Sequence, residues 1–304
     1  MSDLTQDYEK VRAGAPAFYE NERGLIAVRG KEAVQFLNGL ITNDVSKLEE
    51  DTMFTAAFPN AQGRLLAVVR VLKKDDKFLF ETEAATHEKV FQNLFRFTYA
   101  GDFFVEDLSG SYAFFEIQNS KFKIQNEELI HFQSRFFDDY FVPSDAAENF
   151  RSELKKENAL EISDELYELL RIENGVPLYG IDMDETTIVP EIDLPELISY
   201  TKGCYIGQEI IARIHFRGHV AKKLTGLVLS EPFAAAGELN AELKNAEIKS
   251  TDGKNAGRIT SATFSPKLQK TIALAYVRYD YLADGTELKV NDFAAKVTNL
   301  PFIE

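Results

Sequence analysis

The sequence predicts an α+β fold that ends in a small β-barrel or sandwich, with the barrel favoured. Strand-like and helix-like patterns alternate along the first 220 residues, which is typical of an α+β body. After residue 220 the pattern changes to short strand candidates, separated by turns such as Asp252-Gly253 and Asp284-Gly285. We therefore expect a body over residues 1–220, built from two subdomains, and a C-terminal β-barrel over residues 221–304.

Each element of the body follows from its residue spacing. In 31–40, Val34, Leu37 and Leu40 recur at helical spacing, and the amphipathic stretch 85–97 predicts a second helix. Val- and Leu-rich residues predict a buried strand over 64–72, after a turn at 59–63. The other expected strands are 25–28, 52–58, 77–83 and an aromatic-rich β region over 112–142, and the other expected helices are 146–156 and 164–173. In the barrel we expect strands at 224–230, 258–264, 272–279 and 294–299.

Composition limits the classes of function. A net charge of −15 opposes loose binding to nucleic acid or anionic lipid. No apolar run approaches the roughly 18 residues that span a membrane, so a cytoplasmic protein is expected. Cys204 is the single cysteine, so the chain can form no intrachain disulfide. One thiolate is also too few for an iron–sulfur cluster or a Cys-rich zinc site within one chain.

Glu173 is the first candidate site residue. In 164–173, Glu173 shares the helical spacing of Leu166, Leu169 and Leu170, which puts its carboxylate on the apolar stripe. It also lies at the negative end of the helix, where a carboxylate is disfavoured and needs partners. The partner is either the N–H groups of a ligand or a nearby arginine, unless the last helical turn is frayed and solvated.

Cys204 is the second candidate. Gly203 and Gly207 flank it, and a helical stretch begins near Gln208. A helix N-terminus and the nearby Lys202 both favour a thiolate, which is typical of a reactive cysteine. The alternative is a small buried hydrophobic side chain, a common state of free cysteines.

The segment 202–223 is basic, although the chain as a whole is acidic. It contains five lysines and arginines, among them Arg213 and Arg217, against one acid, Glu209. If 213–220 were extended, Arg213, His215, Arg217 and His219 would share one face. We expect this segment to bind the carboxylates of a ligand or an acidic partner, or else to be a solvated surface paired with local acids. No glutamate follows His215, so no metal site is predicted.

Several motifs together resemble one protein family. Residues 202–209 read Lys-Gly-Cys-Tyr-Ile-Gly-Gln-Glu and resemble the K-G-C-[FY]-x-G-Q-E signature of the YgfZ family, a branch of the glycine-cleavage T-protein (aminomethyltransferase) superfamily. The supporting segments, in the family's order, are 36–45 (FLNGLITNDV), 60–64 (NAQGR), 171–180 (RIENGVPLYG), 257–261 (GRITS) and 265–266 (SP). The resemblance runs from about residue 18 to the end of the chain.

This resemblance implies both a fold and a function. The family fold is a ring of domains around a central folate channel, with a C-terminal barrel. The family binds tetrahydrofolate or a one-carbon derivative and acts in iron–sulfur cluster assembly or repair, with assembly proteins or client enzymes as partners. Glu173 matches an acidic position that contacts the pterin in the T-protein, and Glu191 is a looser match to another. The motif also makes Cys204 the expected functional thiol.

One departure separates this chain from the T-protein enzymes. These enzymes carry an acidic pair, one of them catalytic, on the strand after the glycine turn. Here that strand reads Arg-Leu-Leu-Ala-Val-Val over 64–69, so aminomethyl transfer by their mechanism is not expected. The alternatives to a folate-dependent accessory protein are a folate-dependent one-carbon transferase of aminomethyltransferase type and a scaffold that binds folate only structurally.

Overall fold

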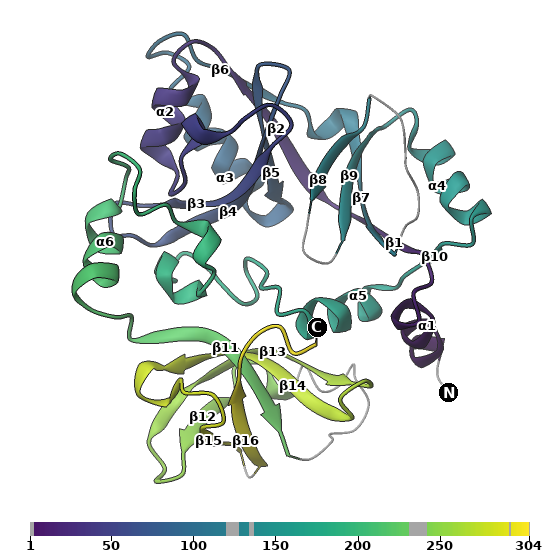
Figure 1. Cartoon of the computed structure of the whole chain (residues 1–304), viewed down its shortest axis with the longest axis vertical. Coiled ribbons are helices and arrows are strands. Elements are labelled where there is room, and N and C mark those ends of the chain that lie inside the picture. The colour runs from purple at the N-terminus through teal and green to yellow at the C-terminus, as the bar shows by residue number, and fades with distance from the viewer. Residues whose placement is uncertain (1–2, 120–127, 134–136, 231–241, 292, 304) are drawn as a thin grey trace. The chain divides into compact units, whose positions relative to one another are not determined.

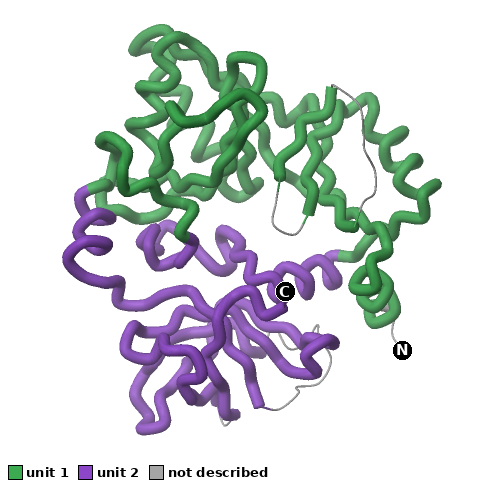
Figure 2. The backbone as a smooth tube through the Cα atoms, in the orientation of Figure 1, with its two compact units in different colours: residues 1–163, 195–208 green, residues 164–194, 209–304 purple. Residues whose placement is uncertain are grey.

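The computed structural model describes residues 3–119, 128–133, 137–230, 242–291 and 293–303. The chain divides into two compact units (Figures 1 and 2). Unit 1 contains residues 1–163 and 195–208, and unit 2 contains residues 164–194 and 209–304. The body-and-barrel boundary at residue 220 and the ring of domains around a channel stay predictions.

Unit 1 contains two five-stranded sheets, and the first is antiparallel throughout. Its strand order is β3 (Met53–Pro59), β4 (Leu65–Lys74), β5 (Lys77–Glu83), β2 (Arg23–Arg29) and β6 (Phe104–Asp107). Buried residues alternate along most of β4, which is the period expected of a strand with one face in a core. Helices α2 (Ala33–Leu40) and α3 (Ala84–Phe95) supply the apolar residues that complete this core.

The second sheet of unit 1 has the order β10 (Leu160–Glu161), β1 (Ala17–Asn21), β7 (Tyr112–Gln118), β9 (Asp138–Pro143) and β8 (Ile130–Gln133). Helix α4 (Ala147–Lys156) packs on one face through Phe150 and Leu154. The other face meets the first sheet, where Phe114 and Phe141 share an apolar cluster with Leu25 and Leu79. The amphipathic helix α1 (Asp3–Arg12) precedes β1 and buries Tyr8 and Val11.

A cluster of five charged side chains also links the two sheets. Arg70 Nε lies 2.8 Å from Glu81, and a second nitrogen of Arg70 pairs with Asp139. Arg23 lies 3.2 Å from Glu81 and 4.0 Å from Glu116. Three acids thus share two arginines in a buried site. Burial raises the pKa of Asp139 to about 7, with Glu116 and Glu81 adding to the rise and Arg70 opposing it.

Unit 2 is organised around a closed barrel of six strands. Their order is β11 (Lys222–Leu229), β14 (Lys270–Arg278), β13 (Asn255–Ser265), β12 (Glu247–Ser250), β15 (Glu287–Val290) and β16 (Phe293–Thr298), and β16 pairs with β11 to close it. Helix α5 (Asp164–Glu173) packs on β13 and β14. Helix α6 (Gln208–Arg217) leads from the unit boundary toward the barrel.

The remaining short helices are 3-10 turns: Val45–Lys47, Ser109–Ser111, Val189–Ile192, Pro195–Leu197 and Tyr279–Tyr281. The α+β class and the C-terminal barrel are confirmed, and the predicted helices and longer strands lie within a few residues of their expected bounds. Helix α1 and the strands β1, β6, β10, β12 and β15 were not predicted individually. Among the described helices, none is long and apolar enough to cross a membrane.

Candidate functional site

Lys202 anchors the loop that carries Cys204. Its ammonium donates hydrogen bonds to the carbonyl oxygens of Asn38, Ile41 and Asn43, at 2.9, 2.7 and 2.7 Å. An ammonium has three N–H donors, so these bonds use all of them. The side chain is buried, which lowers the pKa of Lys202 to about 8, while the nearby Asp44 opposes the shift. Lys202 therefore has no N–H left for a hydrogen bond to a thiolate.

The C-terminal end of the signature over residues 202–209 packs on the turn over residues 60–64. Gly207 has a φ of 80°, and a Cβ added there would lie 2.4 Å from the carbonyl oxygen of Asn60. Only glycine fits such a position, since both the backbone conformation and the space exclude a side chain. The amide of Ile206 also donates to the carbonyl of Gly39 at 3.0 Å. The segments 36–45, 60–64 and 202–207, which are distant in sequence, thus meet in unit 1.

The segment before the signature is tied to the same region. The Thr42 hydroxyl donates to the carbonyl of Leu197 at 2.5 Å, and the Ser199 amide donates to the carbonyl of Thr42 at 3.0 Å. The side-chain amide of Asn43 donates to the carbonyl of Glu196 at 3.0 Å. Hydrogen bonds therefore hold the loop 196–207 on both sides of Cys204.

Cys204 itself is exposed to solvent. A Cβ added at the neighbouring Gly203 would meet no atom within 4 Å, so the backbone of the loop is also uncovered at that residue. The α-helix begins at Gln208, four residues after Cys204, as the sequence predicts. This exposure contradicts the alternative in which Cys204 is a buried hydrophobic side chain. Its chemical role stays a prediction.

Glu173, the last residue of α5, is fully buried. The Ser265 hydroxyl donates to its carboxylate at 2.5 Å, and the Phe302 amide donates to its backbone carbonyl at 2.9 Å. A short hydrogen bond from a hydroxyl to a carboxylate is charge-assisted. Gly175, with a φ of 69°, ends the helical run as the sequence predicts. These contacts and the full burial of the side chain do not fit a frayed, solvated last turn.

Glu191 lies in the same unit as Glu173 and is also buried. Its carboxylate accepts a hydrogen bond from the Ile188 amide at 3.2 Å, which caps the 3-10 helix Val189–Ile192. Next to Glu173, the buried Asn174 Nδ2 has no hydrogen-bond partner among the described residues. A buried amide donor without a partner costs free energy, and such groups are rare in native proteins. The binding roles assigned to Glu173 and Glu191 stay predictions.

A buried ionic network beside Glu173 was missed at the level of sequence. Arg171 donates all five of its N–H groups, to both carboxylate oxygens of Glu168, the Val176 carbonyl, Asp182 and Ser261. Asp182 in turn accepts from the hydroxyls of Thr260 and Ser261 on β13. The network fixes α5 and the following loop to the barrel. The only sequence signal was the Arg171 that opens the motif 171–180.

Helix α6 covers Gln208–Arg217 of the basic segment, which corrects the extended arrangement expected for 213–220. Helix α6 continues to Arg217, so Arg213 and Arg217 share a face at i and i+4, while His215 points in another direction. Arg213 pairs with Glu209 at 2.7 Å, and both side chains are mostly exposed. Lys223 pairs with Asp193 at 2.7 Å. Part of the segment is therefore paired with local acids.

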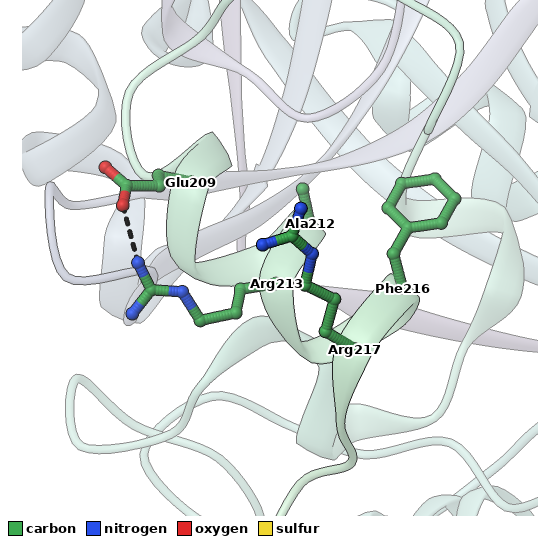
Figure 3. A pocket seen from close by; sticks show the side chains of 5 residues that line it. All are labelled: Glu209, Ala212, Arg213, Phe216 and Arg217. Carbon is green, nitrogen blue, oxygen red and sulfur yellow. Dashed lines mark hydrogen bonds and ion pairs between the residues drawn. The ribbon is translucent and has the colours of Figure 1, made fainter.

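The described residues that line one pocket all lie on α6. The pocket has a volume of about 400 Å³ and is lined by Glu209, Ala212, Arg213, Phe216 and Arg217 (Figure 3). Figure 3 shows Arg213 directed toward Glu209, with Phe216 and Arg217 extending from the next turn. Arg213 is thus placed beside a cavity, but its contact with a ligand stays a prediction.

Two protein-family models match this chain, one in its N-terminal part and one in its C-terminal part. The model of the GCVT N-terminal domain matches residues 2–121, and the model of the glycine cleavage T-protein C-terminal barrel domain matches residues 222–304. The chain belongs to the T-protein superfamily. The aminomethyltransferase T of the glycine cleavage system from Bartonella henselae has the same fold, with a TM-score of 0.86 and 18% identity over 99% of this chain and 90% of that chain.

The similar curated proteins include aminomethyltransferases and an iron–sulfur cluster assembly factor. The aminomethyltransferase of Thermotoga maritima is 29% identical over 308 residues, which cover 91% of this chain and 82% of the relative. The aminomethyltransferase of Caldanaerobacter subterraneus subsp. tengcongensis is 25% identical over 95% of this chain and 84% of the relative. The mitochondrial iron–sulfur cluster assembly factor IBA57 homolog of Mycosarcoma maydis is 27% identical over 67% of this chain and 55% of its own.

Proposed function

We propose that this T-protein superfamily member is a folate-binding accessory protein of the YgfZ branch, which acts in the assembly or repair of iron–sulfur clusters. The observation that carries the proposal is the exposed Cys204 on a loop held by Lys202, within a signature that resembles that branch. A relative named as an iron–sulfur cluster assembly factor supports it. A cytoplasmic location belongs to the same proposal.

The thiol is proposed to act together with a partner. A cluster takes about four ligands, and Cys204 is the single cysteine of the chain. The remaining ligands must therefore come from an assembly protein, a client enzyme or a second copy of the chain. The exposure of Cys204 allows such a partner to reach the sulfur atom.

The folate, as tetrahydrofolate or a one-carbon derivative, is proposed to bind through Glu173, with Glu191 as a second contact. A carboxylate matches the N–H donors of the aminopyrimidine ring, and the partnerless Asn174 Nδ2 would gain an acceptor from a polar ligand. Glu173 is fully buried and bonded to Ser265, so this contact requires nearby side chains to move when the ligand enters. The proposed role of Arg213 is to bind the glutamate tail, in exchange for Glu209.

An aminomethyltransferase-type one-carbon transferase is the second candidate, because several relatives are named as aminomethyltransferases. Against it, β4 offers no carboxylate between Leu65 and Val69, on the strand where the enzymes carry their acidic pair. Turnover of an aminomethylated lipoyl carrier protein, with release of ammonia, separates the two candidates. The accessory role predicts no such turnover and no release of ammonia.

Two measurements test the proposal directly. Calorimetric titration with tetrahydrofolate, its one-carbon derivatives and their polyglutamates should show saturable binding, and Arg213→Ala should reduce any preference for polyglutamates. Cys204→Ser should keep folate affinity but fail to restore iron–sulfur enzyme activity in a strain that lacks the chain. If tetrahydrofolate does not bind, the folate half of the proposal fails. Full restoration by Cys204→Ser would favour a scaffold that binds folate only structurally.

A further inference from the structure

The outward surface of α6 is unusual for a helix of a globular domain. Of its ten residues only Ile211 is buried. Arg213, Phe216 and Arg217 are exposed and lie within about one turn of each other, beside the pocket described above (Figure 3). We call these three residues the α6 face. Half of the residues of this helix are therefore exposed, and the ring of Phe216 contacts that of His215, with 4.7 Å between the ring centroids.

Phe216 is the apolar part of the α6 face. Its side chain is 67% exposed, next to a pocket that the same helix lines. A single exposed apolar residue needs no explanation. A phenylalanine between two arginines is different, because aromatic residues and arginine are the types most enriched at the centres of protein interfaces.

The charge of the α6 face opposes that of the whole chain. Residues 210–223 contain two arginines, two lysines and no acid, in a chain with a net charge of −15. Among the described residues, Arg213 pairs with Glu209 in an exposed i,i+4 ion pair, which is weak and can be exchanged. Arg217 has no ion-pair partner in the part of the chain that the structure describes. A partner with carboxylates would be attracted here and repelled by most other surfaces.

We propose that the α6 face docks an acidic protein partner, which places a carboxylate on Arg217 and an apolar side chain against Phe216. This inference rests on the accessory role proposed above and names the surface that role would use. An oligoglutamate tail supplies carboxylates but no apolar group, so it would leave Phe216 unused. Only three residues, 205–207, separate Cys204 from the first residue of α6, so the docking helix is joined closely along the chain to the proposed functional thiol.

The test uses a labelled acidic peptide as the probe, with glutamate and leucine at helical spacing, and measures its binding to the full chain by fluorescence anisotropy. Phe216→Ala and Arg217→Glu should each weaken binding about tenfold. The matched controls are Tyr99→Ala, at a side chain that is 85% exposed, and Lys77→Glu, which makes the same charge change on an exposed hairpin. They should change affinity less than about twofold. Added salt should weaken binding to the parent chain more than to Arg217→Glu.

Three results would overturn the inference. The first is no binding of the peptide below about 1 mM. The second is an equal loss of peptide affinity in the two α6 variants, Phe216→Ala and Arg217→Glu, and in the two control variants. The third is equal binding of a leucine-free acidic peptide, which would show that no apolar group of the partner contacts Phe216. Tetrahydrofolate affinity, measured in parallel, should be unchanged in Phe216→Ala and Arg217→Glu, while Glu173→Gln should keep peptide binding. Failure of docking and failure of the folate proposal are then separate results.

A photo-crosslinking phenylalanine analogue at position 216 extends the test to cells. The expected product is a protein joined through an acidic segment, and the purified protein should show the same response to Arg217→Glu as the peptide. Capture that persists unchanged in the Arg217→Glu background would contradict the proposed recognition, because the carboxylate contact would then contribute nothing.

Discussion

Replacing Lys202 with methionine tests the anchor of the Cys204 loop. The substitution keeps a long side chain but removes the ammonium that donates to the carbonyls of Asn38, Ile41 and Asn43. Hydrogen bonds to a charged group contribute about 1.5–3 kcal/mol each, or about 4.5–9 kcal/mol for three. Against this, burial lowers the pKa of Lys202 from 10.5 to about 8 although Asp44 opposes the shift, which corresponds to a net cost of about 3 kcal/mol for the charged form.

The difference predicts that Lys202→Met lowers the free energy of unfolding by about 1.5–6 kcal/mol. The lower half of that range is expected, because two of the three bonds are only partly buried and water can replace the lost donor. Urea denaturation measures the change, and hydrogen exchange of residues 202–207 should increase at the same time. Lys77→Met is the matched control, since Lys77 is exposed on a hairpin. A loss of less than about 0.5 kcal/mol would refute the anchoring role.

Three further predictions concern the ligand, the buried charge cluster and the reaction. Glu173→Gln should weaken tetrahydrofolate binding by about tenfold or more, since it removes the charge that strengthens the hydrogen bonds; unchanged affinity in a folded variant rejects the assignment. The raised pKa of Asp139 makes the native state bind its proton more tightly than the unfolded chain, so this stabilisation is complete below about pH 4 and is lost as the pH rises through about 7. Asp139→Asn should remove this pH-dependent loss of stability, which is up to about 4 kcal/mol. Urea denaturation at pH 5 and pH 8 should therefore show a higher free energy of unfolding for the variant, mainly at pH 8. Finally, an aminomethylated lipoyl carrier protein should not be turned over, because β4 lacks an acid over Leu65–Val69; measurable ammonia release would restore the transferase alternative.

The spacing of apolar residues predicted the helices and strands that are long enough to contain several repeats of that spacing. The helices α3, α4 and α5 and the strands β4, β5 and β14 lie close to their expected bounds, because each buries one face or both faces of a regular run. Strand β10 has two residues, and β12 and β15 have four, so no period can be read from them. These short strands form because the backbones of longer neighbouring strands provide hydrogen-bond partners for them.

The candidate site was predictable only in part, because contacts between residues distant in sequence arrange its side chains. The signature around Cys204 is visible in the sequence, but the exposure of its thiol depends on contacts with residues more than 150 positions away, such as Asn38. The same holds for the pairing of Glu173 with Ser265, 92 positions later. The sequence also allows an extended face with Arg213 and Arg217, because alternating apolar residues over 213–220 fit a strand as well as the last turns of a helix.

The measurement closest to the central claim is the rescue of iron–sulfur enzyme activity by Cys204→Ser in a strain that lacks the chain. The thiol is exposed and serine differs from cysteine by one atom, so the variant should fold and should bind tetrahydrofolate with the parent affinity. The proposed function predicts that it nevertheless fails to restore the enzyme activity that the parent chain restores. Full restoration at equal protein levels would contradict a functional thiol at Cys204.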